Sequence, residues 1–213
     1  MQLENKSQSL SLGEKRDKLF ELIKVQGIVF RDVKLSNGST SKYYYDIKRV
    51  INHPQGALLI GELMFNHISQ ININIHEDTD LQKIKSVGGL EAGATPITTA
   101  IVLASARNQT QPENWLYGFF VRKSLKTHGL EKKIEGIVKT PLVVVDDVIT
   151  TGQSVMEAVN ALLVQNISPV RIMTVIDREE TDNKRNILKK NKIQYDSLFK
   201  HSEFKEYIEN KLN

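Results

Sequence analysis

The stretch Leu142-Val-Val-Val-Asp-Asp-Val-Ile-Thr-Thr-Gly-Gln-Ser154 is the most informative part of the chain. Its first four residues are apolar and mostly β-branched, too few for a helix, and they predict a buried strand. Two adjacent carboxylates, Asp146 and Asp147, follow this strand. The turn Thr150–Ser154 then leads into the helical pattern of Val155–Leu163. A strand, an acidic end, a glycine turn and a helix start are typical of a ligand site at the carboxyl edge of a parallel sheet.

The chemistry of this stretch favours a sugar phosphate as the ligand. Backbone N–H groups at a helix start and the helix dipole attract an anion, and the hydroxyls of Thr150, Thr151 and Ser154 add donors. Asp146 and Asp147 would repel a phosphate, so we expect them to face hydroxyl groups, a metal ion, or both. The alternative is an ordinary strand followed by a capped helix. Two carboxylates at the end of an apolar strand are costly to bury without partners, which argues against that alternative.

Composition limits the class of protein. The chain has 213 residues, and we expect 1–213 to form a single domain. It contains no cysteine, which excludes disulfides, thiolate catalysis and cysteine metal sites. The net charge of +4 is mild, and no basic stripe with interleaved aromatics indicates nucleic-acid binding. Because no signal-peptide core and no run of about 18 apolar residues is present, we expect a cytoplasmic protein without membrane contact.

The first quarter of the chain predicts a small unit of its own. Apolar spacing predicts a helix over Glu14–Val25, ended by Gly27. Two strands, Ile28–Leu35 and Lys42–Ile47, flank a hairpin-like turn over Ser36–Thr40. These antiparallel-looking strands do not fit the alternation that follows. We therefore interpret residues 14–50 as an N-terminal hood over the sheet edge.

After Pro54 the patterns alternate between helix and strand. Pro54 begins a helix that runs to about Ile71, with Leu58, Leu59, Leu63, Met64 and Phe65 as its core stripe. Further elements are predicted at Lys83–Val87, Ile97–Ala106, Leu116–Val121, Val170–Ile176, Gln194–Phe199 and Glu203–Leu212. This alternation predicts an α/β fold with a doubly wound, mainly parallel sheet over about residues 54–200. The segments after Val87, Val121 and Val145 should converge at the carboxyl edge of that sheet.

Two loops at those strand ends carry further chemistry. Gly88–Pro96 is a glycine loop before a helix, a pattern that lets a ligand approach the backbone but is weak alone. Arg122, Lys123, Lys126 and His128 place four donors within seven residues, directly after a predicted strand. A solvated basic loop is the alternative. Such concentrated positive charge suits a leaving polyanion better than simple solubility.

Several blocks together resemble one family, the orotate phosphoribosyltransferases, within the type I phosphoribosyltransferases. Leu142–Ser154 matches the signature for phosphoribosyl pyrophosphate (PRPP) over its thirteen positions, and Arg122–Gly129 matches the family's basic loop at every fixed position. Asn37–Asp46, Val87–Pro96 and the pair Asp177-Arg178 are similar to its other motifs, in family order. The resemblance covers about residues 14–200 and implies the type I phosphoribosyltransferase fold. The basic loop is the discriminating block, because other type I members generally lack it.

The resemblance implies an activity. Orotate and PRPP would give orotidine 5′-monophosphate and pyrophosphate, a step of pyrimidine (UMP) synthesis. Mg²⁺ would be the cofactor, bound with PRPP near Asp146 and Asp147 without an assigned direct protein ligand. The protein would be a homodimer whose basic loop reaches into the partner's site. No decarboxylase segment follows, so we expect the monofunctional form.

Residue roles carried over from the family are as follows. Lys126 and His128 on the loop, with Asp146 and Asp147, would be catalytic. Orotate would contact Thr150 and Arg178, with Tyr44 and Tyr45 nearby. PRPP would be bound by Arg122, Lys123, Lys126, His128, Asp146, Asp147, Val148, Ile149, Thr150, Thr151, Gly152, Gln153 and Ser154.

The sequence departs from the family pattern at a few positions. Ala92 and Ser36 stand where some relatives have lysine, and Asn37 replaces the serine of the hood turn. Any PRPP or pyrophosphate contact made by those lysines is therefore absent. Two other functions stay open. One is a PRPP-binding regulator without turnover, although no nucleic-acid-binding element is visible. The other is transfer to another nucleobase, against which Arg178 and the hood tyrosines argue.

Overall fold

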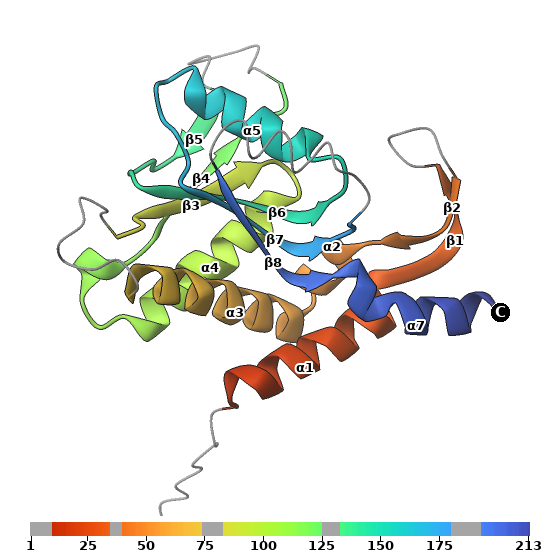
Figure 1. The fold of residues 1–213 in the computed structure, drawn as a ribbon. Coiled ribbons are helices and arrows are strands. Elements are labelled where there is room, and N and C mark those ends of the chain that lie inside the picture. The colour runs from red at the N-terminus through yellow and green to blue at the C-terminus, as the bar shows by residue number, and fades with distance from the viewer. Residues whose placement is uncertain (1–9, 35–39, 74–82, 125–132, 180–192) are drawn as a thin grey trace, which may run out of the picture.

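The computed structural model describes residues 10–34, 40–73, 83–124, 133–179 and 193–213 (Figure 1). Its centre is a six-stranded sheet in the order β5-β4-β3-β6-β7-β8. All pairings are parallel except β4 with β5, which is antiparallel. This confirms the predicted α/β class, although no sequence pattern predicted the short edge strand β5. The strands are β3 (Ser86–Leu90), β4 (Tyr117–Val121), β5 (Ile134–Gly136), β6 (Leu142–Ile149), β7 (Arg171–Asp177) and β8 (Gln194–Lys200).

Helices cover both faces of this sheet, as expected for a doubly wound fold (Figure 1). α3 (Pro54–Ile73) and α4 (Ala94–Asn108) lie on one face, and α5 (Gln153–Leu163) lies on the other. Along β6, Val143 and Val145 pack into the core on the first face, whereas Leu142 and Val144 pack on the second. Burial on both faces explains why this strand is a continuous apolar run instead of an alternating one.

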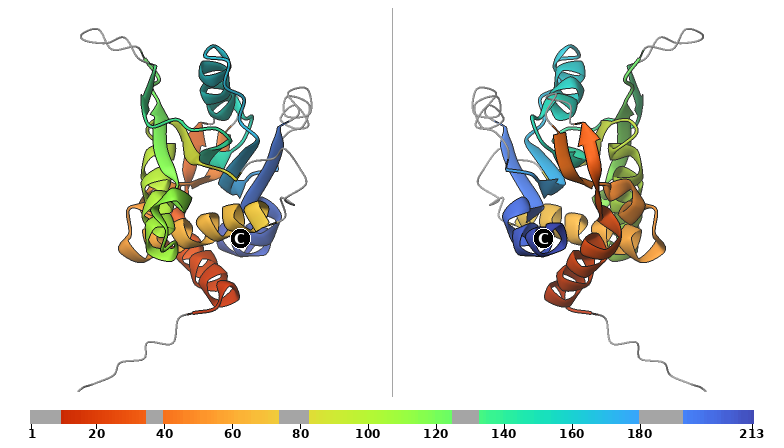
Figure 2. Two further views of the ribbon diagram at one scale, coloured as in Figure 1. Left: turned by 90° about the vertical axis from the view of Figure 1, so that its left-hand side faces the viewer. Right: turned by 90° about the vertical axis from the view of Figure 1, so that its right-hand side faces the viewer.

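The N-terminal elements form a separate layer. α1 (Leu12–Leu22) continues into a π-helical turn, Ile23–Gly27. β1 (Ile28–Lys34) and β2 (Thr40–Tyr45) pair as an antiparallel two-stranded sheet, and the short helix α2 (Ile47–Ile51) follows. We call β1, β2 and α2 the hood. Viewed from the carboxyl ends of the parallel strands, the hood strands stand in front of the central sheet (Figure 2, right).

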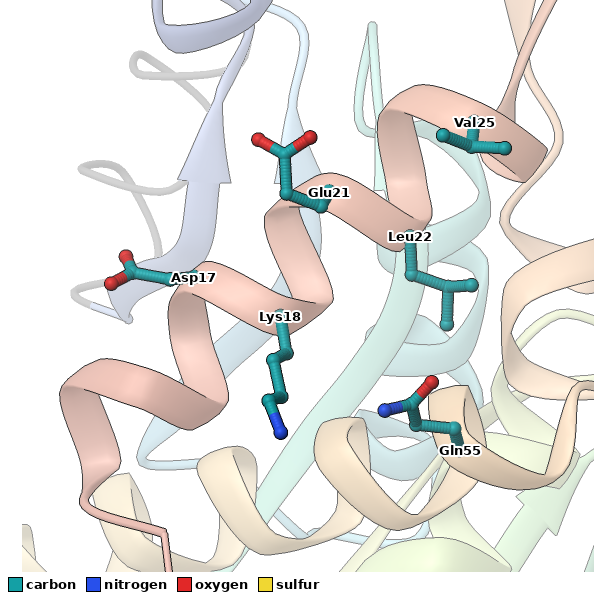
Figure 3. Close-up of a pocket in the computed structure, with 6 residues that line it drawn as sticks. All are labelled: Asp17, Lys18, Glu21, Leu22, Val25 and Gln55. Carbon is teal, nitrogen blue, oxygen red and sulfur yellow. The ribbon is translucent and has the colours of Figure 1, made fainter.

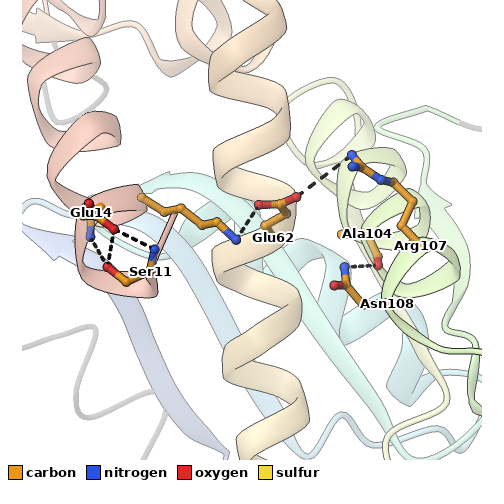
Figure 4. A network of polar contacts seen from close by, with 7 residues as sticks. Ser11, Glu14, Glu62, Ala104, Arg107 and Asn108 are labelled. Atoms are coloured by element: carbon orange, nitrogen blue, oxygen red, sulfur yellow. Dashed lines mark hydrogen bonds and ion pairs between the residues drawn. The ribbon is translucent and has the colours of Figure 1, made fainter. Parts of the chain in front are cut away.

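Polar contacts join α1, α3 and α4. The Glu62 carboxylate of α3 pairs with Lys15 of α1 at 3.0 Å and with Arg107 of α4 at 4.0 Å (Figure 4). At the start of α1, Ser11 and Glu14 form a capping box, in which the Glu14 N–H donates to Ser11 Oγ at 3.2 Å. These partly exposed ion pairs contribute little free energy each. Their role is to fix how the three helices sit against one another.

The C-terminal helix α7 (His201–Leu212) packs against both α1 and the hood. Its buried Phe204 stacks on Phe20 of α1, with ring centroids 4.6 Å apart. The same ring meets Tyr45 of β2 edge-on at 5.8 Å. An aromatic cluster therefore joins α1, α7 and β2 beside the hood.

Two strand boundaries differ from prediction for a common reason. β3 was expected at Lys83–Val87 but spans Ser86–Leu90, and β6 was expected to end at Val145 but continues to Ile149. Both extensions are fixed by neighbouring strands. β3 stays paired with β4 up to Leu90 and Val121, and β6 stays paired with β7 up to Ile149 and Asp177. A single-segment pattern contains no information about such pairing.

Two other predictions are wrong. Leu58 was placed in the core stripe of α3, but it is 44% exposed, while Ile60 and Ile68 are buried. Ile47 was placed in the second hood strand, but it begins α2, since its buried side chain packs in the main core. Of the turn predicted over Ser36–Thr40, residues 36–39 lie outside the described residues and Thr40 begins β2. Among the helices that the structure describes, none is long and apolar enough to cross a membrane.

Candidate active site

The turn after β6 forms a hollow suited to a phosphate group. Gly152 adopts φ +82° at the N-cap of α5, a conformation that favours glycine, and no side chain caps the helix start. The N–H of Gln153 donates to Thr151 Oγ1 at a long 3.4 Å. Helix N–H groups and the helix dipole therefore point toward an anion site. The hollow, of about 80 Å³, is lined by Asp146, Val148, Ile149, Thr150, Thr151, Gly152, Gln153, Ser154 and Val155.

Two carboxylates border this hollow, and their surroundings differ. Asp146 is only 6% exposed, and its Oδ1 accepts a hydrogen bond from the Asp147 N–H at 3.0 Å. Burial, followed by the charge of Asp147, raises the pKa of Asp146 to about 8. Asp147 is half-buried, and its Oδ1 accepts from the Val148 N–H at 2.8 Å. At neutral pH, burial therefore favours the protonated form of Asp146, which can donate to a ligand oxygen.

A lysine of the hood pairs with one of these two carboxylates, and the sequence did not predict this contact. Lys48 of α2 places its Nζ 3.1 Å from Asp147 Oδ2. Burial alone would lower the pKa of Lys48, but the charge of Asp147 and the hydrogen bond to it raise that pKa above its usual value. The two residues lie 99 positions apart. Only the folding of the hood over the end of β6 brings them together, so no local pattern could have found the contact.

The three strand ends predicted to converge do so. The Glu91 N–H, just after β3, donates to the Val121 carbonyl at the end of β4 at 2.9 Å. Glu91 Oε1 accepts from the Lys123 N–H at 3.1 Å. A methyl group added at Gly93 would lie 3.1 Å from Oδ1 of both Asp146 and Asp147. Gly93 thus leaves the space beside the acidic pair open to a ligand.

The basic loop is only partly described. Arg122 Nε pairs with Glu135 Oε1 on β5 at 3.1 Å, and its guanidinium lies 5.7 Å from the centroid of the Phe120 ring. The Lys133 amine donates to the Lys123 carbonyl at 3.0 Å, which links the two ends of the loop. Lys126 and His128 lie outside the described residues. The structure therefore places the base of the loop beside the glycine loop and leaves the roles of its tip as predictions.

Arg178 directly follows β7 and lies against the hood. It is 4% exposed, and its N–H donates to the Ile149 carbonyl at 3.1 Å. Its guanidinium carbon lies 5.3 Å from the Tyr43 ring centroid and 5.8 Å from that of Tyr45. Of the predicted pair Tyr44 and Tyr45, one ring thus lies beside Arg178, and Tyr43 is an additional neighbour. Tyr43 and Tyr45 share one face of β2 because successive strand side chains alternate.

The acidic pair fits a magnesium ion bound together with a phosphorylated substrate. Mg²⁺ keeps several waters and is usually held by one or two carboxylates plus substrate phosphates. Asp146 and Asp147 offer two carboxylates beside the phosphate hollow. Within the described ranges, no group of three or more His, Cys, Asp or Glu side chains could hold a metal by itself. A metal at this site would therefore depend on substrate oxygens.

A larger hollow elsewhere lacks this chemistry. It measures about 460 Å³ and lies between α1 and the start of α3 (Figure 3). No turn with glycine at a helix start borders it, and its charged groups belong to exposed helix faces. We therefore assign the active site to the smaller hollow. The larger one is lined by Asp17, Lys18, Glu21, Leu22, Val25 and Gln55.

Comparisons with known proteins agree with this assignment. No family model matches the chain. An orotate phosphoribosyltransferase of Aquifex aeolicus is 35% identical over 193 residues, 88% of this chain and 96% of the relative. One from Corynebacterium glutamicum is 37% identical over 168 residues, 78% of this chain and 82% of the relative. The crystal structure of the Mycobacterium tuberculosis H37Rv orotate phosphoribosyltransferase in complex with PRPP is 32% identical, with a TM-score of 0.63 over 88% of this chain and 97% of that one.

Proposed function

Because the chain belongs to the orotate phosphoribosyltransferase family, we propose that it transfers the phosphoribosyl group of PRPP to orotate. The products are orotidine 5′-monophosphate and pyrophosphate, and the reaction serves pyrimidine synthesis. The observation that carries this proposal is the meeting of three features at one sheet edge. They are the phosphate hollow after β6, the Asp146–Asp147 pair and the buried guanidinium of Arg178.

PRPP binds along the turn that follows β6. The N–H groups and hydroxyls of Thr150–Ser154 hold the 5′-phosphate, whose negative charge is favoured by the dipole of α5. The ribose hydroxyls lie against Asp146 and Asp147. A protonated Asp146 can donate to one hydroxyl oxygen while the Asp147 carboxylate accepts from another. The Lys48 amine lies 3.1 Å from Asp147 Oδ2 and pairs with that carboxylate.

The reaction breaks the bond between the anomeric carbon and pyrophosphate oxygen and forms a bond to an orotate nitrogen. Positive charge develops on the ribose and negative charge on the leaving group. Asp147 favours the first of these charges from beside the ribose. Arg122, Lys123, Lys126 and His128 of the basic loop favour the second. No covalent nucleophile takes part, which agrees with a chain that has no cysteine.

Magnesium fits this scheme as a cofactor of the substrate. Asp147, and Asp146 once it has lost its proton, would hold it, directly or through water, together with oxygens of PRPP. The ion supplies positive charge that stabilises the departing pyrophosphate. Because Asp146 and Asp147 are acidic, the site can accept a divalent cation between them and the negatively charged PRPP.

Orotate lies between the hollow and the hood. Arg178 presents a planar fork that matches the orotate carboxylate, and its burial strengthens that contact. Thr150 and the backbone at Tyr44 and Tyr45 form the rest of the pocket. The carboxylate is what separates orotate from other pyrimidines, so Arg178 sets the preference for the base.

The active unit is a homodimer in which each basic loop reaches into the partner's site. Support comes from the match of Arg122–Gly129 to the family's loop. Closure of such a loop excludes water and prevents hydrolysis of PRPP.

The loss of orotate absorbance on addition of PRPP and Mg²⁺ tests the function. The purified protein should consume orotate only when both are present. A double variant, Asp146→Asn with Asp147→Asn, is the matched control and should lose turnover without unfolding. Failure of the unmodified protein to consume orotate would contradict the proposal.

A further inference from the structure

His201, the first residue of α7, lies against the two hood rings that flank Arg178. Its Nδ1 is hydrogen-bonded to the Tyr45 hydroxyl, with the two atoms 2.9 Å apart. Its ring also stacks on Tyr43, with centroids 5.8 Å apart and planes 7° from parallel. The C-terminal helix, which lies beside the hood strands (Figure 1), is thus joined to the rings next to Arg178.

The same helix start holds the turn that carries Arg178. The Ser202 N–H donates to Glu179 Oε2 at 2.7 Å, and the Glu179 N–H donates to Asp177 Oδ1 at 2.8 Å. Glu179 adopts φ +56°, which is uncommon for a residue with a side chain and needs support from its surroundings. On the other side, the Arg178 N–H is bonded to β6 through Ile149. The backbone around Arg178 is therefore fixed between β6 and α7.

The aromatic rings of Tyr43 and Tyr45 also restrain the guanidinium of Arg178. Tyr43 and Tyr45 meet edge to face, 5.8 Å apart and 89° from parallel. Both lie within 6 Å of the guanidinium carbon of Arg178, a distance at which a cation is attracted to an aromatic face. His201 contacts both rings and so limits how either one can turn. A planar fork binds a carboxylate well only when its plane is set in advance.

We propose that His201 is a positioning residue for orotate recognition. It holds Tyr43 and Tyr45 so that their rings keep Arg178 in the orientation that accepts the orotate carboxylate. The inference rests on the proposed function and adds a residue of α7 to the determinants of base binding. His201 does not touch the reacting atoms, so its loss should act on orotate binding and spare the PRPP half of the site.

Steady-state kinetics with a set of variants tests this inference. His201→Ala removes both the hydrogen bond and the stacking, and should raise KM for orotate about tenfold. KM for PRPP should change less than about twofold, because the phosphate hollow is untouched. His201→Asn keeps a polar atom near the position of Nδ1, so its KM for orotate should lie between those of the wild type and His201→Ala. Tyr45→Phe, which removes only the hydroxyl, should resemble His201→Asn in magnitude.

Lys205→Ala is the matched control on the same helix. Lys205 is exposed and, within the part of the chain that the structure describes, pairs at 3.8 Å with Glu209 on the surface, so both KM values should stay at wild-type levels. Thermal melting of each variant checks folding, and if His201→Ala is unfolded the other two substitutions decide the question. Equal changes in both KM values, or an unchanged KM for orotate in an active enzyme, would overturn the inference. A wild-type protein that uses no orotate would instead overturn the proposed function, and the inference with it.

Discussion

Asp146 and Asp147 are neighbours in the chain but differ in burial and in partners. Burial raises the pKa of Asp146 to about 8, whereas Asp147 accepts a hydrogen bond from Lys48 at 3.1 Å. Asp146 thus favours its protonated form near neutral pH, while Asp147 lies beside a cationic group. Ribose hydroxyls can donate to one oxygen and accept from another, so this arrangement matches them better than two equal charges would. Lys48 lies in the hood, which links the hood to the sugar half of the site.

For Lys48 we predict that the substitution Lys48→Met lowers kcat/KM for PRPP selectively. Loss of the amine leaves Asp147 without its cation and weakens ionisation of the pair, so kcat/KM for PRPP should fall about tenfold. The falling side of the pH–rate profile should move to higher pH, because the Lys48 charge lowers the pKa of Asp146 and the protonated form is the one that donates to the ribose. Lys48→Arg keeps the charge and should retain most activity. An unchanged pH profile in the methionine variant would argue against this role.

At the scale of the elements, the glycines of β3 are needed first for close packing of the strands and only then for ligand binding. The sequence placed Gly88 and Gly89 in a loop, but both lie within the strand. A methyl group on Gly89 would come within 2.1 Å of the Val145 carbonyl oxygen, and one on Gly88 within 2.2 Å of the Phe119 carbonyl oxygen. Their lack of a side chain lets β3 lie close to β4 and β6. That closeness brings the glycine loop to the acidic pair.

We therefore predict that Gly89→Ala destabilises the fold by about 1–3 kcal/mol, because backbone atoms must shift to admit the methyl group. Chemical denaturation monitored by circular dichroism measures this. Gly13→Ala is the control, since the nearest atom to a methyl there is 4.0 Å away. On the surface of α1 it should stabilise by about 0.5–1 kcal/mol. Equal effects of the two substitutions would refute the packing argument.

Prediction from sequence succeeded where a local pattern determines the structure. The apolar run of β6, the turn at Gly152 and the following helix are such patterns, and so is the spacing of α3 after Pro54. It failed where contact with a segment distant in the sequence determines the structure. Ile149 belongs to β6 because β7 pairs with it, and Lys48 meets Asp147 across 99 positions. His201 and Tyr43 are joined in the same way, and His201 lies in none of the motifs that the sequence offered.

At the scale of the whole molecule, the buried Asp146 makes stability depend on pH. Its pKa is raised from 3.8 to about 8 on folding, so the folded state binds a proton more tightly than the unfolded state. Stability is therefore greatest below pH 4 with respect to this group and is lost as pH rises toward 8. The site thus holds a group that opposes folding at neutral pH, as functional sites often do.

Asp146→Asn should remove this dependence. Melting temperatures measured between pH 5 and 8 without ligand should fall less steeply in the variant than in the parent protein. At pH 8 the variant should melt clearly higher than the parent protein, because no ionised carboxylate has to be buried at this position. Asp147→Asn is the comparison, since Asp147 is more exposed and paired with Lys48. If the melting temperatures of the parent protein and of Asp146→Asn changed equally between pH 5 and 8, the raised pKa of Asp146 would be contradicted.

Sharing of the basic loop between subunits is also a property of the whole assembly. Lys126→Ala alone should lower kcat by about a hundredfold, as expected for a charge that acts on the leaving group. Refolding it together with an equal amount of the Asp146→Asn, Asp147→Asn variant should restore about a quarter of wild-type activity. Half of the dimers are then mixed, and each has one intact site. No recovery in the mixture would argue for loops that act within their own subunit.

The most direct test of the function is to identify the nucleotide formed from an equal mixture of orotate, uracil and adenine. With PRPP and Mg²⁺, mass spectrometry should find orotidine 5′-monophosphate and an equal amount of pyrophosphate, because Arg178 selects the base that carries a carboxylate. Formation of uridine or adenosine monophosphate in its place, or release of pyrophosphate with no nucleotide, would contradict the account.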